Sequence, residues 1–234
     1  MVKSELITKS PLRIFESSTH GGVGKGNIAV IAAPKGVGKT ACLVHIATDQ
    51  LLQKNHVIHV TFCDTPDHII TWYEDIFKEI SRRFKTDNSL EIHDEIVRNR
   101  LIMNFKQSST LVTHVIASIK KLVEKIHFSA DVIVIDGYDF SKATPKDILA
   151  FKTFAEDLDL EIWFSVSLKG KGNYFNENGI PDVLARFIDE ISIVIILESH
   201  EDHVRLKLIK DHDDQAVSNM HLKLDPAILL IAEE

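Results

Sequence analysis

A lysine and a threonine suited to phosphate chemistry, Lys39 and Thr40, follow two closely spaced glycines in the segment APKGVGKT. The segment is close to the phosphate-loop (P-loop) pattern G-x-x-x-x-G-K-[ST], although Ala33 stands at the position of the first glycine. In a P-loop the backbone amides surround the phosphates, the lysine reaches the β- and γ-phosphates, and the hydroxyl binds Mg²⁺. The predicted nucleotide-binding residues are Pro34, Lys35, Gly36, Val37, Gly38, Lys39, Thr40 and Ala41.

The segments around this loop have the order that a P-loop requires. Ile28–Ala32 is a short apolar run rich in β-branched residues, which predicts a buried strand. Thr40–Ala47 then carries apolar residues at helical spacing. A loop between strand and helix directs its amides and the positive end of the helix dipole at one point, where an anion is stabilised.

A carboxylate, Asp136, ends a second apolar run, Asp131–Asp136. Open α/β sheets bind ligands at the carboxyl ends of their strands, so Asp136 is expected to face the P-loop and to hold Mg²⁺, usually through water. The alternative is a core strand that ends in a solvated aspartate. The P-loop upstream favours the metal role.

The composition of the chain is typical of a globular protein and disfavours a secreted, membrane-spanning or strongly nucleic-acid-binding one. Of its 234 residues 44 % are hydrophobic and 26 % charged, which is typical of a globular protein with a substantial core. A net charge of −7 disfavours general binding to nucleic acid or anionic membranes. Two cysteines, without a secretion signal or long apolar span, indicate the cytoplasm. We expect an irregular lead-in over residues 1–19 and one domain over residues 20–234.

Strands and helices are expected to alternate along the rest of the chain. The predicted strands cover 57–62, 100–105, 131–136, 160–167, 191–197 and 204–209, with a final hairpin around Asp225 and Pro226. The predicted helices cover 65–84, 111–126, 148–158 and 182–187, whereas residues 85–100 are ambiguous. This alternation predicts an α/β fold with a mostly parallel sheet, flanking helices and antiparallel terminal strands.

The segments Lys25–Ile31 and Gly36–Thr40 resemble the entry to RecA-fold ATPases of the KaiC and replicative-helicase branch, and Val60–Pro66 resembles the second strand of that group. The resemblance extends from about residue 20 to the end of the chain, and the helicase branch often has alanine where Ala33 stands. It implies a RecA-like P-loop NTPase fold, ATP with Mg²⁺ as the bound nucleotide, and homo-oligomers, of which a hexamer is one expected size.

The resemblance also implies a catalytic base. Many P-loop ATPases have a catalytic glutamate directly after the aspartate that Asp136 matches, but here the next residue is Gly137. RecA-like enzymes place the base at the end of the neighbouring strand, and the matching residue is Asp64, which is one methylene shorter than glutamate. The alternative interpretation is that Asp64 only precedes a helix and interacts favourably with its dipole.

Further roles are implied for residues late in the chain. The family supplies a lysine and an arginine from the adjacent subunit, and the matching residues are Lys210 and His212, although neutral histidine stabilises transition-state charge poorly. A solvated acidic loop is the alternative. Ser165 and Ser167 match a polar sensor at a strand end. The loop Lys169–Gly179 matches a region that touches single-stranded DNA in one branch, or it orders against a neighbouring subunit.

Three functions follow from these residues. The first is a slow Mg²⁺-dependent ATPase that assembles with itself when ATP binds, for regulation or remodelling. The second is a nucleotide-binding switch that does not hydrolyse ATP. The third is an accessory ATPase that acts on single-stranded DNA, which the acidic composition disfavours.

Overall fold

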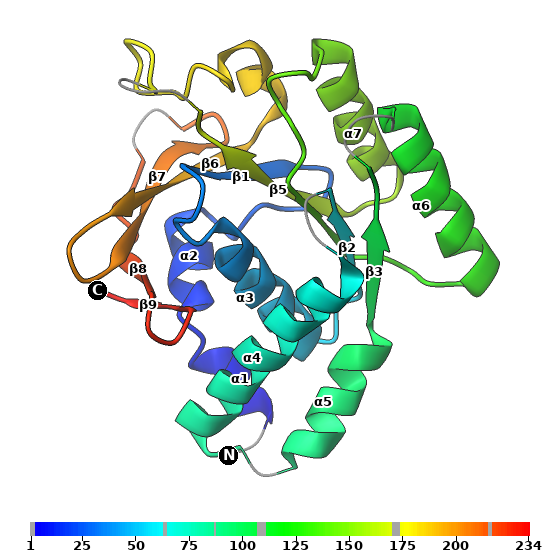
Figure 1. Ribbon diagram of the computed structural model, residues 1–234, viewed down its shortest axis with the longest axis vertical. Coiled ribbons are helices and arrows are strands. Elements are labelled where there is room, and N and C mark those ends of the chain that lie inside the picture. The colour runs from blue at the N-terminus through cyan, green and yellow to red at the C-terminus, as the bar shows by residue number, and fades with distance from the viewer. Residues whose placement is uncertain (1–2, 63–64, 87, 107–110, 170–173, 215–216) are drawn as a thin grey trace.

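The computed structural model describes residues 3–62, 65–86, 88–106, 111–169, 174–214 and 217–234, and its centre is one nine-stranded sheet (Figure 1). The strand order is β3-β2-β4-β5-β1-β6-β7-β8-β9. Neighbouring strands from β3 to β6 are parallel, and those from β6 to β9 are antiparallel. The predicted α/β fold with antiparallel terminal strands is therefore confirmed.

The strands begin and end near the predicted positions. They are β1 (Ile28–Ala33), β2 (Val57–Thr61), β3 (Arg100–Asn104), β4 (Val132–Asp136), β5 (Glu161–Ser167), β6 (Ile193–Ser199), β7 (Val204–Asp211), β8 (Leu222–Asp225) and β9 (Leu230–Glu233). The central strand β1 is buried along its whole length, and its side chains alternate between hydrophobic clusters on the two faces of the sheet. A strand covered on both faces reads as a continuous apolar run, which is why the sequence predicts it well.

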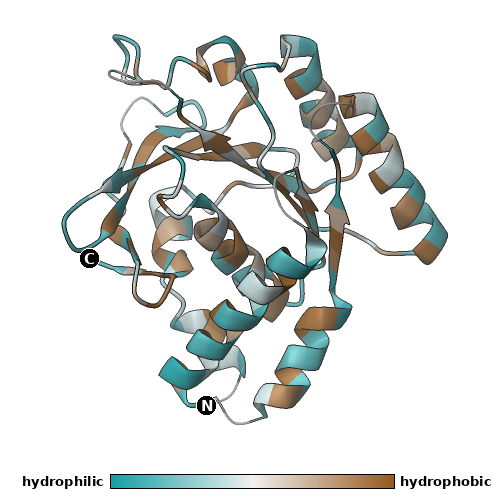
Figure 2. Ribbon diagram, in the orientation of Figure 1, coloured by the Kyte–Doolittle hydropathy of each residue, from teal (hydrophilic) through white to brown (hydrophobic). Residues whose placement is uncertain are grey.

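Helices cover both faces of the sheet. They are α1 (Lys3–Thr8), α2 (Leu12–Ser18), α3 (Lys39–Leu52), α4 (Pro66–Phe84), α5 (Ser89–Arg98), α6 (Val112–Ile126), α7 (Pro145–Asp157) and the 3₁₀ helix η1 (Ala185–Glu190). Helices α1 to α5 pack into one cluster, and α6, α7 and η1 into the other. Figure 2 shows the central strands as hydrophobic and helices such as α4 and α6 as hydrophobic on one side only. Among the described residues no helix is long and apolar enough to cross a membrane.

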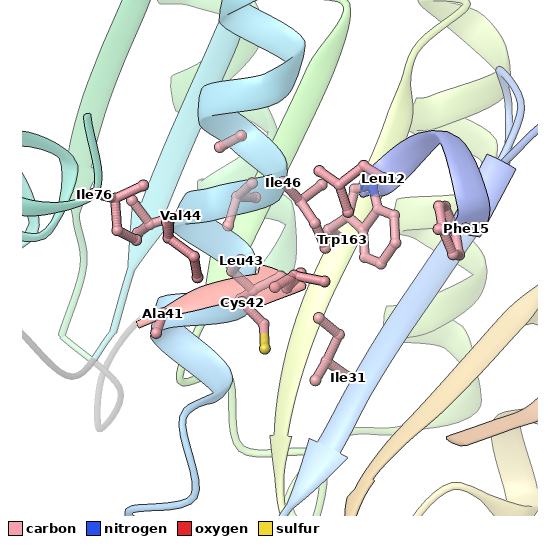
Figure 3. Packing of buried hydrophobic residues seen from close by; sticks show 14 of the residues in the cluster. Leu12, Phe15, Ile31, Ala41, Cys42, Leu43, Val44, Ile46, Ile76 and Trp163 are labelled. Carbon is pink, nitrogen blue, oxygen red and sulfur yellow. The ribbon is translucent and has the colours of Figure 1, made fainter. Parts of the chain in front are cut away.

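The prediction of an irregular lead-in over residues 1–19 is wrong for the part that the structure describes, because α1 and α2 lie there. Leu12 and Phe15 are buried, and the Phe15 ring lies 5.5 Å from that of Trp163 between centroids. Figure 3 shows Leu12 and Phe15 beside Trp163, with Ile46 of α3 on the other side of the indole from Phe15. Helices this short are marginal in isolation, so contacts distant in sequence, which periodicity does not report, stabilise them.

The ambiguous segment 85–100 contains helix α5. Only Ile92 and Ile96 of this helix are buried, and they lie four residues apart on one face. Two apolar contacts in a polar segment give a weak periodic signal. The helix predicted around 182–187 is the 3₁₀ helix η1, which begins three residues later, at Ala185, and ends at Glu190.

The terminal hairpin of β8 and β9 packs against the helix that follows the P-loop. The backbone N–H of Ile231 in β9 donates a hydrogen bond to Nδ1 of His45 in α3 at 2.8 Å. His45 is 4 % exposed and Leu224 of β8 is 1 % exposed, so this contact is part of the core. The end of the chain therefore helps to hold α3 in position.

Two buried histidines predict an acid-sensitive fold. Burial lowers the pKa of His45 to about 4, and the charge of Arg83 adds to this effect. Burial also lowers the pKa of His59 to about 4, with Asp136 opposing and Arg100 reinforcing the shift. In the unfolded chain both pKa values return to about 6.5. Between these values the unfolded state binds more protons, so stability is fully present above the unfolded pKa and falls as the pH falls towards the folded pKa.

We therefore expect the free energy of unfolding to drop between pH 7.5 and pH 5 by on the order of 2 kcal/mol for each histidine. Urea unfolding at both pH values measures it. His59→Phe, which keeps a ring in the site and removes the titrating group, should lose about half as much as the wild type over the same interval. Equal losses in the two proteins would contradict the assignment of His59.

Candidate nucleotide-binding site

The predicted P-loop connects β1 to α3 at the carboxyl end of the parallel strands. Gly36 and Gly38 have φ values of 85° and 115°, in a region that residues with side chains rarely adopt. A Cβ atom on Gly36 would meet no atom within 4 Å, whereas one on Gly38 would lie 2.3 Å from Cδ2 of Leu224. The loop thus has an open side at Gly36, and at Gly38 it is in close contact with the terminal hairpin.

Lys39 begins α3 with its side chain directed back into the loop. Its amino group donates hydrogen bonds to the backbone carbonyls of Ala33 and Pro34 at 3.1 and 2.8 Å. The residue is 8 % exposed. The ammonium therefore lies where a P-loop lysine meets the β- and γ-phosphates of a nucleotide.

Asp136 accepts hydrogen bonds from two hydroxyl groups, one on each carboxylate oxygen. Thr40 Oγ1 donates to Oδ2 at 2.7 Å, and Ser165 Oγ donates to Oδ1. The carboxylate is 3 % exposed, so the bonds form in a buried environment where they fix its orientation. Hydroxyl and carboxylate oxygens are the ligands that Mg²⁺ prefers, and the two that the sequence predicts lie side by side. These residues fit a Mg²⁺–nucleotide complex.

Ser165 lies on β5, the strand between β1 and β4, and it links the two predicted parts of the site. Its hydroxyl also accepts the backbone N–H of Gly137 at 2.8 Å, which holds the turn after Asp136. Ser167, the other serine that matches a polar sensor, is exposed at the end of the strand. The structure therefore places Ser165 at the site, through Asp136.

Leu224, which contacts Gly38, is a residue of the site that the sequence did not indicate. It is an ordinary apolar position in a terminal strand, and its closeness to the P-loop arises only from the tertiary fold. A loop glycine followed far downstream by a leucine carries no local pattern that could have revealed the contact.

Asp64, the predicted base, lies outside the described residues, as does Cys63. The helix start beside it is described. Thr65 caps α4 by accepting the backbone N–H of His68 at 3.4 Å, and Pro66 is the first helical residue. Thr65 is therefore the N-cap of α4, and the catalytic role of Asp64 stays a prediction.

Lys210 and His212 lie towards the amino ends of the parallel strands, away from the P-loop of the same chain. Asp211 between them pairs with Ile193 at the start of β6, and Ile193 pairs with Ala29 near the start of β1. The P-loop follows the opposite end of β1. Neither residue is therefore placed to reach a nucleotide in its own chain, so the predicted role requires a second subunit.

The side chains of both residues are held within the chain. The Lys210 amino group donates to two backbone carbonyls in and after η1 at 2.7 and 2.6 Å, and burial lowers its pKa. The two ring nitrogens of His212 face acceptors, a carboxylate oxygen of Asp211 at 2.7 Å and the carbonyl of Val23 at 3.1 Å.

The predicted loop Lys169–Gly179 is described only outside residues 170–173. Lys169 forms an ion pair with Asp139 at 3.1 Å, next to a cavity of about 450 Å³ at the ends of β4 and β5. The rings of Tyr174 and Phe175 stand edge to face, 6.5 Å apart between centroids. Whether this loop contacts DNA or a subunit stays a prediction.

The strand order, the glycine loop and the Lys39, Thr40 and Asp136 groups together define a P-loop NTPase fold. A family model described as an AAA domain matches residues 5–146, which is more than half of the chain. The chain therefore belongs to this AAA domain family of P-loop ATPase type. A comparison with curated proteins found no match.

The contact between Gly38 and Leu224 generates a test of the loop geometry. Gly38→Ala should lower the free energy of unfolding by about 1–3 kcal/mol because alanine is strained at this positive φ. The clash of the new Cβ with Leu224 should lower it further. Gly36→Ala is the control, since it also has positive φ but borders open space.

Thermal or urea unfolding of the single variants and of Gly38→Ala combined with Leu224→Ala gives the coupling energy. The cost of Gly38→Ala should be smaller by about 1 kcal/mol or more when residue 224 is alanine. A cost that is the same in both backgrounds would show that the hairpin does not constrain the P-loop.

Proposed function

We propose that the protein is a Mg²⁺-dependent ATPase of the KaiC and replicative-helicase type, which hydrolyses ATP slowly and assembles with itself when ATP binds. The observation that supports this most is the hydrogen bond between the half-buried Thr40 and the buried Asp136, beside Lys39 and the end of β1. Lys39 and Thr40 are neighbours in the sequence, and Asp136, 96 residues after Thr40, completes a set of one cation and two oxygen ligands at the same loop.

Each of these residues has a defined task. The loop amides and Lys39 bind the β- and γ-phosphates, and Lys39 can exchange its bonds to backbone carbonyls for bonds to phosphate oxygens. Thr40 and Asp136 are the residues that would hold Mg²⁺, which neutralises charge on the phosphates when bound. Ser165 keeps the carboxylate of Asp136 oriented. The packing of Gly38 against Leu224 holds the start of α3.

Slow hydrolysis follows from the proposed base. Asp64 has the charge to polarise an attacking water, but its carboxylate is withdrawn by one methylene relative to glutamate. A misplacement near 1 Å can cost on the order of 10²-fold in rate. The proposed deficit is therefore one of geometry and not of charge.

A non-hydrolysing nucleotide switch is the second candidate, and a specific observation favours it. The side chains of Lys210 and His212 both form hydrogen bonds within their own chain. They could stabilise the transition state in a neighbouring subunit only if these bonds were rearranged or if they acted at longer range. An assay of ATP hydrolysis with and without single-stranded DNA separates the two candidates from an accessory ATPase that DNA stimulates.

The base is tested by Asp64→Asn. We expect this variant to bind ATP as the wild type does and to lose hydrolysis by 10²-fold or more, because a general base acts only in the chemical step. Asp67→Asn is the matched control, since Asp67 is exposed in the first turn of α4 and carries the same charge. Steady-state ATPase assays measure both. Wild-type turnover in Asp64→Asn would exclude Asp64 as the base, whereas no measurable turnover in the wild type would move the switch to first place.

Assembly is tested by mixing two inactive variants. Lys39→Ala should weaken ATP binding, and Lys210→Ala should lower turnover more than binding. Lys207→Ala, on the exposed side of β7, should change neither. If Lys210 acts on a neighbour, a mixture of Lys39→Ala and Lys210→Ala subunits contains sites with both residues intact.

We expect part of the ATPase activity to return on mixing, together with ATP-promoted oligomers in a mass measurement. No recovery on mixing, in a protein that stays monomeric with saturating Mg²⁺–ATP, would contradict self-assembly.

A further inference from the structure

A second cavity, of about 360 Å³, lies away from the P-loop on the face of the sheet that α3 covers. Its walls are the connection between α1 and α2, the end of α4 and the strand β9. Figure 1 labels these elements around α3. Ile14, Ile80, Phe84 and Leu230 supply much of the apolar lining. The volume is at the lower end of the range of small-molecule sites.

A buried polar group lines this cavity. His45 is 4 % exposed, and its Nδ1 accepts the N–H of Ile231, so the proton of the neutral ring is on Nε2. Within the described part of the chain the hydrogen bond of this ring is the one at Nδ1, so Nε2 has no protein partner there. The imidazole therefore offers a donor that the protein itself leaves available. Because burial and Arg83 lower the pKa of His45 to about 4, the ring is neutral at pH 7.

The charges at the cavity favour an anion. Lys9 and Arg83 line it, and within the described part of the chain neither forms an ion pair. Arg13 also lines it but is already paired with Glu16 at 2.9 Å and with Asp49. Glu233 is the one carboxylate among the lining residues. With two cationic side chains that lack an ion-pair partner and one carboxylate, the lining of the cavity has a net positive charge.

We propose that this cavity binds a small organic anion with an apolar body. Its carboxylate, phosphate or sulfonate group would lie against Arg83, Lys9 and the Nε2–H of His45. Hydrogen bonds from these donors to an anion would be charge-assisted and therefore stronger than those between neutral groups. Its apolar part would cover Ile80 and Phe84. This site is separate from the P-loop and does not depend on ATP hydrolysis.

The probe for this site is 1-anilinonaphthalene-8-sulfonate, an apolar aromatic anion whose fluorescence rises on binding. We expect Arg83→Gln to weaken its binding about fivefold or more, while Arg82→Gln, an exposed neighbour paired with Glu79, leaves it unchanged. His45→Asn, in which Oδ1 can still accept the N–H of Ile231 but no Nε2–H remains, should weaken it to a similar extent. Decanoate should displace the probe at concentrations at least tenfold lower than decanol, which has the same chain without the charge.

Three results would overturn the proposal. They are equal probe binding by Arg83→Gln and the wild type, equal displacement by decanol and decanoate, and loss of probe binding in Lys39→Ala, which would place the probe in the P-loop. Arg83 is exposed, so its variant tests the site even if His45→Asn does not fold.

Discussion

The hydrogen bond between Thr40 and Asp136 is the interaction on which the arrangement of the site depends. It joins the first turn of α3 to the end of β4, across the intervening strand β5, and Ser165 on that strand holds the second carboxylate oxygen. Strand order makes this possible, because parallel strands bring their carboxyl ends to one edge of the sheet. A buried carboxylate with both oxygens bonded has a fixed orientation, which a metal ligand requires.

The terminal hairpin gives the P-loop helix a second support. Leu224 contacts Gly38 at the start of α3, and Ile231 bonds His45 two turns further along the same helix. The helix that carries Lys39 and Thr40 is thus clamped between the sheet and the end of the chain. The hairpin also forms one wall of the second cavity beside His45, so the candidate nucleotide site and this cavity share one structural element.

Much of the fold could be predicted from the sequence, for reasons that differ between elements. The buried strands β1 and β4 are continuous apolar runs, and α4 has a capping threonine and proline at its start, so local chemistry specifies them. Lys39, Thr40 and Asp136 also belong to local sequence patterns, and the structure joins Thr40 to Asp136 by a hydrogen bond. Helices α1, α2 and α5 are short or polar and depend on tertiary contacts, so they could not be predicted. The contact of Leu224 with Gly38 is likewise a property of the complete fold.

The most direct measurement is calorimetric titration of ATP with and without Mg²⁺ into the wild type, Lys39→Ala and Asp136→Asn. The wild type should bind Mg²⁺–ATP. Lys39→Ala should lose roughly 1.5–3 kcal/mol of binding free energy, the usual magnitude for a hydrogen bond to a charged group. Asp136→Asn should retain ATP binding and lose the gain that Mg²⁺ provides. Unchanged ATP binding by a folded Lys39→Ala protein, or an unchanged Mg²⁺ effect in Asp136→Asn, would contradict the assignment of this site.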